Sequence, residues 1–238
     1  MKIEIEGQPY RYISENSSEC SSECAFLLTK QNEKYKDDAI DRGAHSIITP
    51  SECWNLFGLS RICVIGITGT NGKTTTASAI YSLMLDLGHK AAMQGTRGFF
   101  MNDAPVEGKT LTTPTVLNTY RHMAEAIAAG CEYFIMEVSS HAIEQERIAG
   151  ITFGLKILTN ITQDHLDYHE SIEEYIRIKN LFFQDDTKKL INKDEPKAEF
   201  NFKNAFTYGV ENPATYKIIA YSLNNGVSGV LKYFEEHV

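Results

Sequence analysis

The chain has 238 residues, of which 42% are hydrophobic and 23% charged, and its formal net charge is −8. This length suits one large or two small domains with buried cores. The negative charge argues against sequence-independent nucleic-acid binding, and the chain has no apolar run long enough to span a membrane. Five cysteines, an odd number, and an N-terminus without a signal-peptide pattern predict reduced thiols in a cytoplasmic protein.

The order of the predicted elements indicates an α/β protein with two domains. Residues 1–58 are predicted to form a small α/β domain, with strands at 25–28 and 46–49 and a helix at 35–42. In residues 59–238 strands and helices alternate, which favours a mostly parallel sheet with helices on both faces. The predicted strands are 61–67, 90–94, 132–138, 152–159 and 188–192, and the predicted helices are 73–87, 115–129, 140–148 and 171–184. We predict no regular element in 95–114 and a strand-rich tail in 204–238.

A glycine-rich turn follows the strand at 61–67 and opens the next helix. Its sequence is Gly69-Thr70-Asn71-Gly72-Lys73-Thr74-Thr75. Glycines allow several backbone N–H groups to face one anion, and the helix N-terminus adds partial positive charge. Lys73 suits the β- and γ-phosphates of a nucleotide, and the Thr74 hydroxyl suits magnesium. Ile67 stands where the general phosphate-loop pattern has its first glycine, so an ordinary strand–turn–helix corner with threonine caps is the alternative.

Two further buried strands are predicted to end in polar residues. Glu137 closes the apolar run 133–136, at the sheet edge where ligands gather, and a carboxylate there can hold magnesium. A lone strand-end acid is the alternative. The strand at 152–159 leads into a polar cluster that we interpret as a site, although a single histidine at a strand end is usually structural: Asp164, His165, Asp167 and His169.

These blocks, taken in order, resemble the Mur ligases. The resemblance rests on residues 69–75, on Thr112-Thr113-Pro114, on Met136 to His141 with Gln145 and Arg147, on Asn160 to His169, and on Tyr175 and Lys179. Within that family, the Glu-Val-Ser-Ser-His and Asp-His-Leu-Asp-Tyr-His blocks resemble the UDP-N-acetylmuramoyl-tripeptide synthetases (MurE type). The resemblance is strong over residues 61–195 and weak over 1–58.

The resemblance implies an ATP- and Mg²⁺-dependent ligase of peptidoglycan precursor synthesis. ATP would phosphorylate the free carboxylate of UDP-N-acetylmuramoyl-L-alanyl-D-glutamate, and the amine of a diamino acid, meso-diaminopimelate or lysine, would attack the acyl phosphate. Lys73 would hold the γ-phosphoryl group, Thr74 and Glu137 the first magnesium, and His165 and Lys179 the second. From the sequence alone Lys179 would be interpreted as a surface lysine of a helix, whereas the resemblance implies that it acts as a carbamate, which forms only from the neutral amine.

The resemblance also assigns the partner contacts. Thr112, Thr113, Ser139, Gln145 and Arg147 match positions that bind the muramoyl-peptide nucleotide, and Ser17 matches a uridine-nucleotide contact. Arg147 suits a carboxylate or phosphate through bidentate hydrogen bonds. We expect a monomer without nucleic-acid partners.

Two other functions remain possible from the sequence alone. A folylpolyglutamate synthetase shares the phosphate loop and the lysine but normally lacks a uridine-nucleotide domain. The other possible function is that of a non-catalytic nucleotide-binding fragment. The family usually has three domains, and the residues after Pro196 leave no room for the last of them, a Rossmann-like domain. We therefore expect this chain to be truncated and inactive in ligation by itself.

Overall fold

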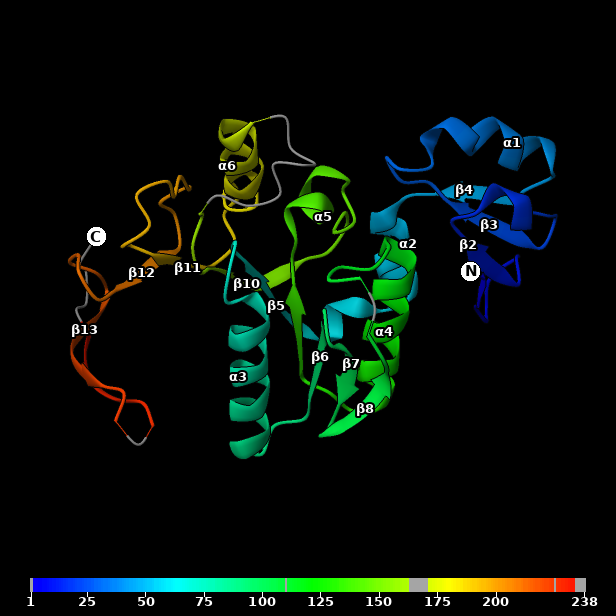
Figure 1. Ribbon diagram of the computed structural model, residues 1–238. Helices are drawn as coiled ribbons and strands as arrows, with labels where there is room; N and C mark the ends of the chain where they lie inside the picture. The colour runs from blue at the N-terminus through cyan, green and yellow to red at the C-terminus, as the bar shows by residue number, and fades with distance from the viewer. Residues whose placement is uncertain (1, 110, 163–170, 225, 234–238) are drawn as a thin grey trace.

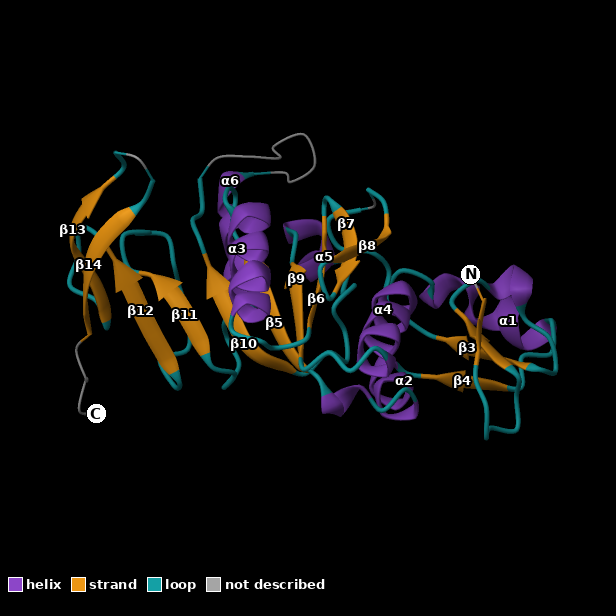
Figure 2. Cartoon of the chain, turned by 90° about the horizontal axis from the view of Figure 1, so that it is seen from below, coloured by secondary structure: helices purple, strands orange, loops and turns teal. Residues whose placement is uncertain are grey.

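The computed structural model describes residues 2–109, 111–162, 171–224 and 226–233. Within these residues the strands form one four-stranded and one ten-stranded sheet. Figure 1 shows the small sheet at one end of the molecule and the C-terminal strands at the other, and Figure 2 shows the same separation from below. None of the described helices has the length and apolar character needed to cross a membrane.

The small sheet has the strand order β1-β2-β3-β4, with β1 antiparallel to β2 and the other pairs parallel. The strands and helix predicted at 25–28, 46–49 and 35–42 are present, whereas β1, β2 and α2 were not predicted. Helix α2 begins at Pro50 because Thr49 and Glu52 form a capping box and proline suits the first helical position. This part comprises β1 (Lys2–Glu4), β2 (Tyr12–Ser14), η1 (Ser17–Glu19), β3 (Cys24–Leu27), η2 (Glu33–Tyr35), α1 (Lys36–Asp41), β4 (Ser46–Ile48), α2 (Pro50–Leu56) and η3 (Leu59–Arg61).

The large sheet has the order β14-β13-β12-β11-β10-β5-β9-β6-β7-β8. All neighbouring pairs from β13 to β6 are parallel, which confirms the predicted mostly parallel sheet. Its elements are β5 (Cys63–Thr68), α3 (Lys73–Asp86), β6 (Ala91–Gly95), β7 (Gly98–Met101), β8 (Ala104–Glu107), α4 (Val116–Ala128), β9 (Tyr133–Glu137), α5 (Ser140–Glu144), β10 (Phe153–Leu158), α6 (Ile172–Leu181), β11 (Lys189–Asn192), β12 (Ala205–Gly209), β13 (Tyr216–Ser222) and β14 (Ser228–Tyr233).

Helices cover both faces of the large sheet because its central strands are apolar on both sides. In β5, Ile65 and Ile67 pack with Tyr81 of α3, whereas Val64 belongs to the cluster that contains Tyr120 of α4. Alternate residues of a strand point to opposite faces, so the two helices lie on opposite sides of the sheet (Figure 1). This arrangement brings the carboxyl ends of β5, β9, β6 and β10 to one edge.

The prediction of no regular structure in 95–114 was wrong, because β7 and β8 form a hairpin there. The strands are short, and Pro105 in the second one argues against a strand in the sequence, because proline is tolerated only at special strand positions such as an edge strand. Asn102 and Asp103 make the two-residue turn with positive φ angles of 46° and 70°. The helix predicted at 140–148 is also shorter, since Glu146 has a φ of 55°.

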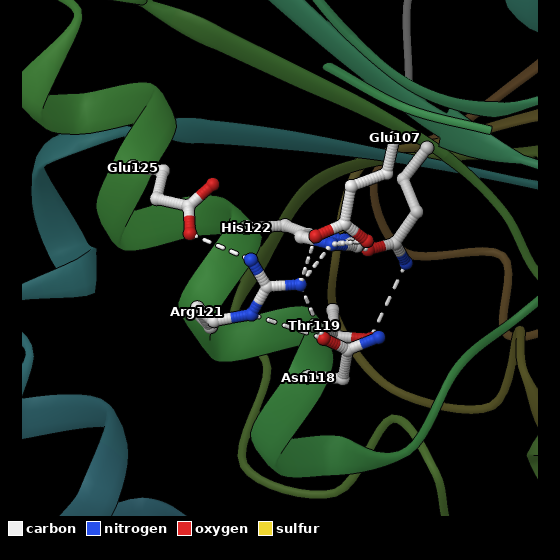
Figure 3. Close-up of polar contacts among 7 residues, drawn as sticks. Glu107, Asn118, Thr119, Arg121, His122 and Glu125 are labelled. Carbon is white, nitrogen blue, oxygen red and sulfur yellow. Dashed lines mark hydrogen bonds and ion pairs between the residues drawn. The ribbon is translucent and has the colours of Figure 1, made fainter. Parts of the chain in front are cut away.

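A buried polar network joins this hairpin to α4 and β6. His122 is fully buried, and its Nδ1 lies 2.6 Å from Gln94 Oε1 while its Nε2 lies 3.1 Å from Glu107 Oε2. Arg121 binds Glu107 and also lies 2.8 Å from His122 Nε2 (Figure 3). Burial lowers the pKa of His122, against the effect of Glu107. The network fixes the ends of β6 and β8, from which the chain enters two loops described below.

We expect His122 to make stability depend on pH. The folded-state pKa lies below the unfolded value of 6.5, so the unfolded chain binds the proton more readily. The free energy of unfolding should therefore fall as the pH drops below about 6.5, by at most about 1.4 kcal/mol per pH unit from this group. Urea titrations between pH 7.5 and 5 should show a flatter profile for His122→Gln than for the wild type. Equal slopes in the two proteins would contradict this assignment.

Candidate functional site

The turn between β5 and α3 is a tightly held loop. Gly69 has a φ of 155°, and a Cβ there would lie 1.8 Å from Thr159 Oγ1. Thr70 N donates to Asn160 O at 2.9 Å, and Thr159 Oγ1 donates to Asn71 O at 2.6 Å. The loop is thus fastened to the residues that follow β10, which requires glycine at the point of closest approach.

Replacing Gly69 with alanine should displace this loop. The clash with Thr159 and the unfavourable φ should together cost roughly 1–3 kcal/mol of unfolding free energy. Gly88→Ala is the matched control, because Gly88 has a φ of 84° but nothing within 4 Å of the added Cβ. Chemical denaturation should show a larger loss for Gly69→Ala than for Gly88→Ala, and equal losses would mean that backbone strain alone is responsible.

Lys73 and Thr74 open α3 on the side of the loop. Lys73 Nζ donates to Gly69 O at 2.7 Å and to Thr70 O at 2.9 Å. Thr74 Oγ1 donates to Glu137 Oε2 at 2.9 Å. A cation, a helix N-terminus and a hydroxyl–carboxylate pair therefore lie together at the sheet edge.

Glu137 is the last residue of β9 and is only 2% exposed. Thr96 N donates to its Oε1 at 2.9 Å, and Thr96 Oγ1 donates to its Oε2 at 3.2 Å. Thr96 follows β6, which runs parallel to β9 with Gln94 opposite Met136. Sequence reasoning missed Thr96. A polar residue directly after a buried strand was the signal that could have found it.

The segment Thr112–Thr113 lies against the end of β9 and α5. Thr113 Oγ1 donates to Glu137 O at 2.9 Å and accepts from Ser139 N at 3.1 Å. Arg147 Nη1 donates to Thr113 O at 3.0 Å, and its Nε is buried with no hydrogen-bond partner among the described residues. One donor of the guanidinium is therefore unpaired within the described part of the chain, although it is shielded from solvent.

Helix α6 completes the site with two buried side chains. Tyr175 and Lys179 are each 1% exposed, and Lys179 Nζ lies 4.8 Å from the centroid of the Tyr175 ring. Tyr175 Oη lies 2.9 Å from Thr70 Oγ1, which joins the helix to the glycine-rich loop. The other end of α6 is fixed by Lys156 of β10, whose Nζ donates to Phe182 O at 2.8 Å.

These groups surround one cleft of about 290 Å³. Six of the predicted site residues line it, and Thr74 and Glu137 adjoin it through Lys73 and Thr113. Leu111, Ser140, His141 and Tyr175 line it without having been assigned a role. The complete lining consists of Lys73, Leu111, Thr112, Thr113, Ser139, Ser140, His141, Arg147, Tyr175 and Lys179.

The predicted loop residues Gly69, Thr70, Asn71 and Gly72 do not line this cleft, and neither do Ser17, Gln145 and Thr75. Ser17 lies in η1 of the small sheet region, where its hydrogen bond helps to lower the pKa of Asp38. Gln145 Oε1 accepts from Gln31 Nε2 at 2.8 Å and so joins α5 to the N-terminal region. Thr75 is exposed on α3. His165, with Asp164, Asp167 and His169, lies outside the described residues.

Comparison with known proteins relates this arrangement to one family. Residues 67–237 match the Mur ligase middle domain. The UDP-N-acetylmuramoyl-L-alanyl-D-glutamate–2,6-diaminopimelate ligase of Wolinella succinogenes is 52% identical over 236 residues, which make up 99% of this chain and 54% of that protein. The chain thus spans about half the length of the curated relatives it matches.

Solved structures show the same fold. A structure of a UDP-N-acetylmuramoyl-L-alanyl-D-glutamate–2,6-diaminopimelate ligase has a TM-score of 0.73 at 23% identity and covers 96% of this chain and 55% of that one. The FolC protein of E. coli, in complex with DHPP and ADP, has a TM-score of 0.55 at 17% identity and covers 76% and 50%. With the family match over residues 67–237, the chain belongs to the Mur ligase family.

Proposed function

We propose that this protein is an ATP-dependent ligase that joins 2,6-diaminopimelate to UDP-N-acetylmuramoyl-L-alanyl-D-glutamate. The observation that carries this proposal is the single cleft that unites Lys73, the neighbouring Thr74–Glu137 pair, Arg147 and Lys179. The choice of diaminopimelate over lysine follows the name of the Wolinella succinogenes relative. Residues 1–58 are proposed to bind the UDP-sugar and residues 59–238 to bind ATP.

The glycine-rich loop fits a triphosphate. The 14-residue helix α3 begins at Lys73, where the first backbone N–H groups have no partner within the helix and the helix dipole favours an anion. Lys73 adds a full charge for the β- and γ-phosphates. We assign this loop to ATP.

Magnesium fits the oxygen donors beside the loop. The Thr74 hydroxyl and the Glu137 carboxylate lie 2.9 Å apart, and Mg²⁺ prefers such oxygen ligands together with phosphate oxygens. When bound there, Mg²⁺ would neutralise charge that develops on the transferred phosphoryl group. His165 and carbamylated Lys179 are proposed as ligands of a second magnesium.

The carbamate assignment of Lys179 is supported by its burial beside the cleft. Burial disfavours a charged ammonium, and only the neutral amine attacks CO₂. The new N–C bond would replace one N–H bond, the proton would leave to solvent, and the side chain would become an anion.

Four residues that line the cleft, Thr112, Thr113, Ser139 and Arg147, are proposed to position the acid substrate. The guanidinium of Arg147, which lines the cleft, offers a charge-assisted hydrogen bond to a carboxylate or phosphate. The substrate carboxylate oxygen would attack the γ-phosphorus and release ADP, and the diaminopimelate nitrogen would then attack the acyl carbon and release phosphate and a proton. Thr112, Thr113 and Ser139 would hold the peptide, and Gln145 and Ser17 would contact the nucleotide-sugar farther away.

The remaining proposals follow from this chemistry. We also propose a monomer, and ATP with a nucleotide-sugar as substrates favours the cytoplasm. The 52% identity to the Wolinella succinogenes ligase extends over 99% of this chain, and so includes residues 1–58, which favours this reaction over folate glutamylation.

The test is a chimera that joins this chain to the C-terminal half of the Wolinella succinogenes ligase. Given ATP, Mg²⁺, diaminopimelate and UDP-N-acetylmuramoyl-L-alanyl-D-glutamate, it should form the tripeptide product with one ADP and one phosphate per amide bond. Calorimetry of this chain alone should detect binding of ATP and binding of UDP-N-acetylmuramoyl-L-alanyl-D-glutamate. Glutamylation of a folate, or failure to bind either nucleotide, would contradict the proposal.

A further inference from the structure

Thr96 makes three hydrogen-bond contacts that converge on the candidate magnesium site. Its backbone N–H meets Oε1 of Glu137 at 2.9 Å, and its hydroxyl lies 3.2 Å from Oε2 of the same carboxylate and 3.0 Å from Thr112 Oγ1. Glu137 also accepts from Thr74. Thr96 therefore contacts both oxygens of the carboxylate and, through Thr112, the rim of the cleft.

The directions of these bonds follow from counting protons. An ionised carboxylate can only accept, so the single hydroxyl proton of Thr96 is donated to Glu137. The Thr96 oxygen must then accept from the Thr112 hydroxyl. The relay consequently runs from Thr112 through Thr96 to Glu137, and Thr112 presents lone pairs rather than a proton to whatever binds in the cleft.

Glu137 packs closely against the end of β6, which restricts the positions that its carboxylate can take. A Cβ on Gly95 would lie 2.1 Å from Glu137 Oε1, so the carboxylate sits directly over a glycine. The parallel pairing of β6 with β9 brings the residues after both strands side by side. The carboxylate thus lies close to the backbone of Gly95 and accepts hydrogen bonds from Thr96 and Thr74.

We propose that Thr96 is a positioning residue that orients Glu137 for magnesium. Through Thr112, it also links this carboxylate to the part of the cleft that is proposed to bind the acid substrate. The inference rests on the proposed function, and it adds a residue and a coupling to it. A ligand N–H that binds Thr112 would strengthen the relay, so binding of the muramoyl-dipeptide nucleotide should tighten binding of Mg²⁺ with ATP, and the reverse.

The experiment compares Thr96→Val with Thr96→Ser in the full chain. Valine keeps the shape and the backbone N–H but removes the hydroxyl, whereas serine keeps the hydroxyl. The readout is Mg²⁺-dependent binding of a non-hydrolysable ATP analogue, with and without UDP-N-acetylmuramoyl-L-alanyl-D-glutamate. Thr207→Val is the matched control, since Thr207 bonds to Thr215 far from the cleft on β12.

Thr96→Val should raise the Mg²⁺ concentration for half-saturation by about 10- to 100-fold, as loss of an outer-shell partner does. Its affinity for metal-free ADP should stay unchanged, which a general folding defect would not allow. Thr96→Ser and Thr207→Val should resemble the wild type. The dipeptide nucleotide should lower the Mg²⁺ requirement of the wild type but not that of Thr96→Val.

An unchanged Mg²⁺ requirement in Thr96→Val would overturn the positioning role, and an equal effect of the dipeptide nucleotide in both proteins would overturn the link through Thr112. A wild-type chain that shows no Mg²⁺-dependent nucleotide binding would instead contradict the proposed function. The failures of the two proposals are therefore distinguishable.

Discussion

Replacing Lys73 with methionine should weaken binding of Mg²⁺–ATP to this chain by about 10- to 100-fold. Methionine keeps much of the aliphatic stem but removes the ammonium that would bond the β- and γ-phosphates, and a hydrogen bond to a charged group contributes about 1.5–3 kcal/mol. ADP should lose less affinity than ATP, because it lacks the γ-phosphate. Isothermal titration calorimetry with ADP and a non-hydrolysable ATP analogue measures both values.

The control for this substitution is Lys203→Met, which removes an exposed ammonium paired with Asp186 on the surface. It should leave both affinities unchanged. Lys73 also donates to Gly69 O and Thr70 O, so the thermal unfolding temperature of Lys73→Met should be measured in parallel. A folded Lys73→Met protein that binds ATP as tightly as the wild type would contradict the assignment of the loop.

Replacing Lys179 with alanine should reduce ligation by the chimera by about 100-fold or more, the usual loss when a preorganised charged group is removed from an active site. The substitution leaves space beside Tyr175, so added formate or acetate should restore part of the rate by supplying a carboxylate where the carbamate stood. Initial rates with and without these acids, at saturating substrates, measure the effect.

Mass spectrometry gives an independent readout for Lys179. The wild-type chain, kept near neutral pH with bicarbonate, should carry an adduct of one CO₂ that disappears in Lys179→Ala and remains in Lys188→Ala, an exposed-surface control. Full ligation activity in Lys179→Ala would rule out the metal-ligand role. An adduct that persists in this variant would place the carbamate on another lysine.

The sequence predicted the central sheet well because its strands are continuous apolar runs separated by helices. The runs before Gly69 and before Glu137 became β5 and β9, and both strands are largely buried. The hairpin of β7 and β8 was missed since four-residue strands carry almost no periodicity. Its turn depends on positive φ angles at Asn102 and Asp103, which tertiary contacts stabilise.

The candidate site was predictable from the sequence where its residues lie within one short motif. Lys73 and Thr74 belong to a single stretch of sequence, and Lys73 Nζ bonds to Gly69 and Thr70 of the same loop. Thr96 lies 41 residues from Glu137 along the chain, and its role arises only from the parallel pairing of β6 with β9. Lys179 reads as a surface lysine in the sequence, yet its side chain is buried in the folded chain.

Buried polar groups outside the cleft illustrate the same limit. His122 lies on a helix with no sequence signal for a network. Only the fold brings Glu107 to its ring (Figure 3), and Gln94 approaches the same ring from β6. Such contacts join segments that are far apart in the sequence, and the sequence does not show that they lie close together in space. They fix the loops that carry Thr96 and Thr112, so the geometry of the cleft depends on residues that no motif contains.

The most direct test of the account is a crystal structure of this chain with Mg²⁺, a non-hydrolysable ATP analogue and UDP-N-acetylmuramoyl-L-alanyl-D-glutamate. We predict the triphosphate against residues 69–74, a magnesium ion beside Thr74 and Glu137, and the substrate carboxylate facing the γ-phosphate within the cleft of Lys73, Arg147 and Lys179. Nucleotide density elsewhere on the chain, or the two substrates in separate cavities, would contradict the central claim that one cleft holds both reacting groups.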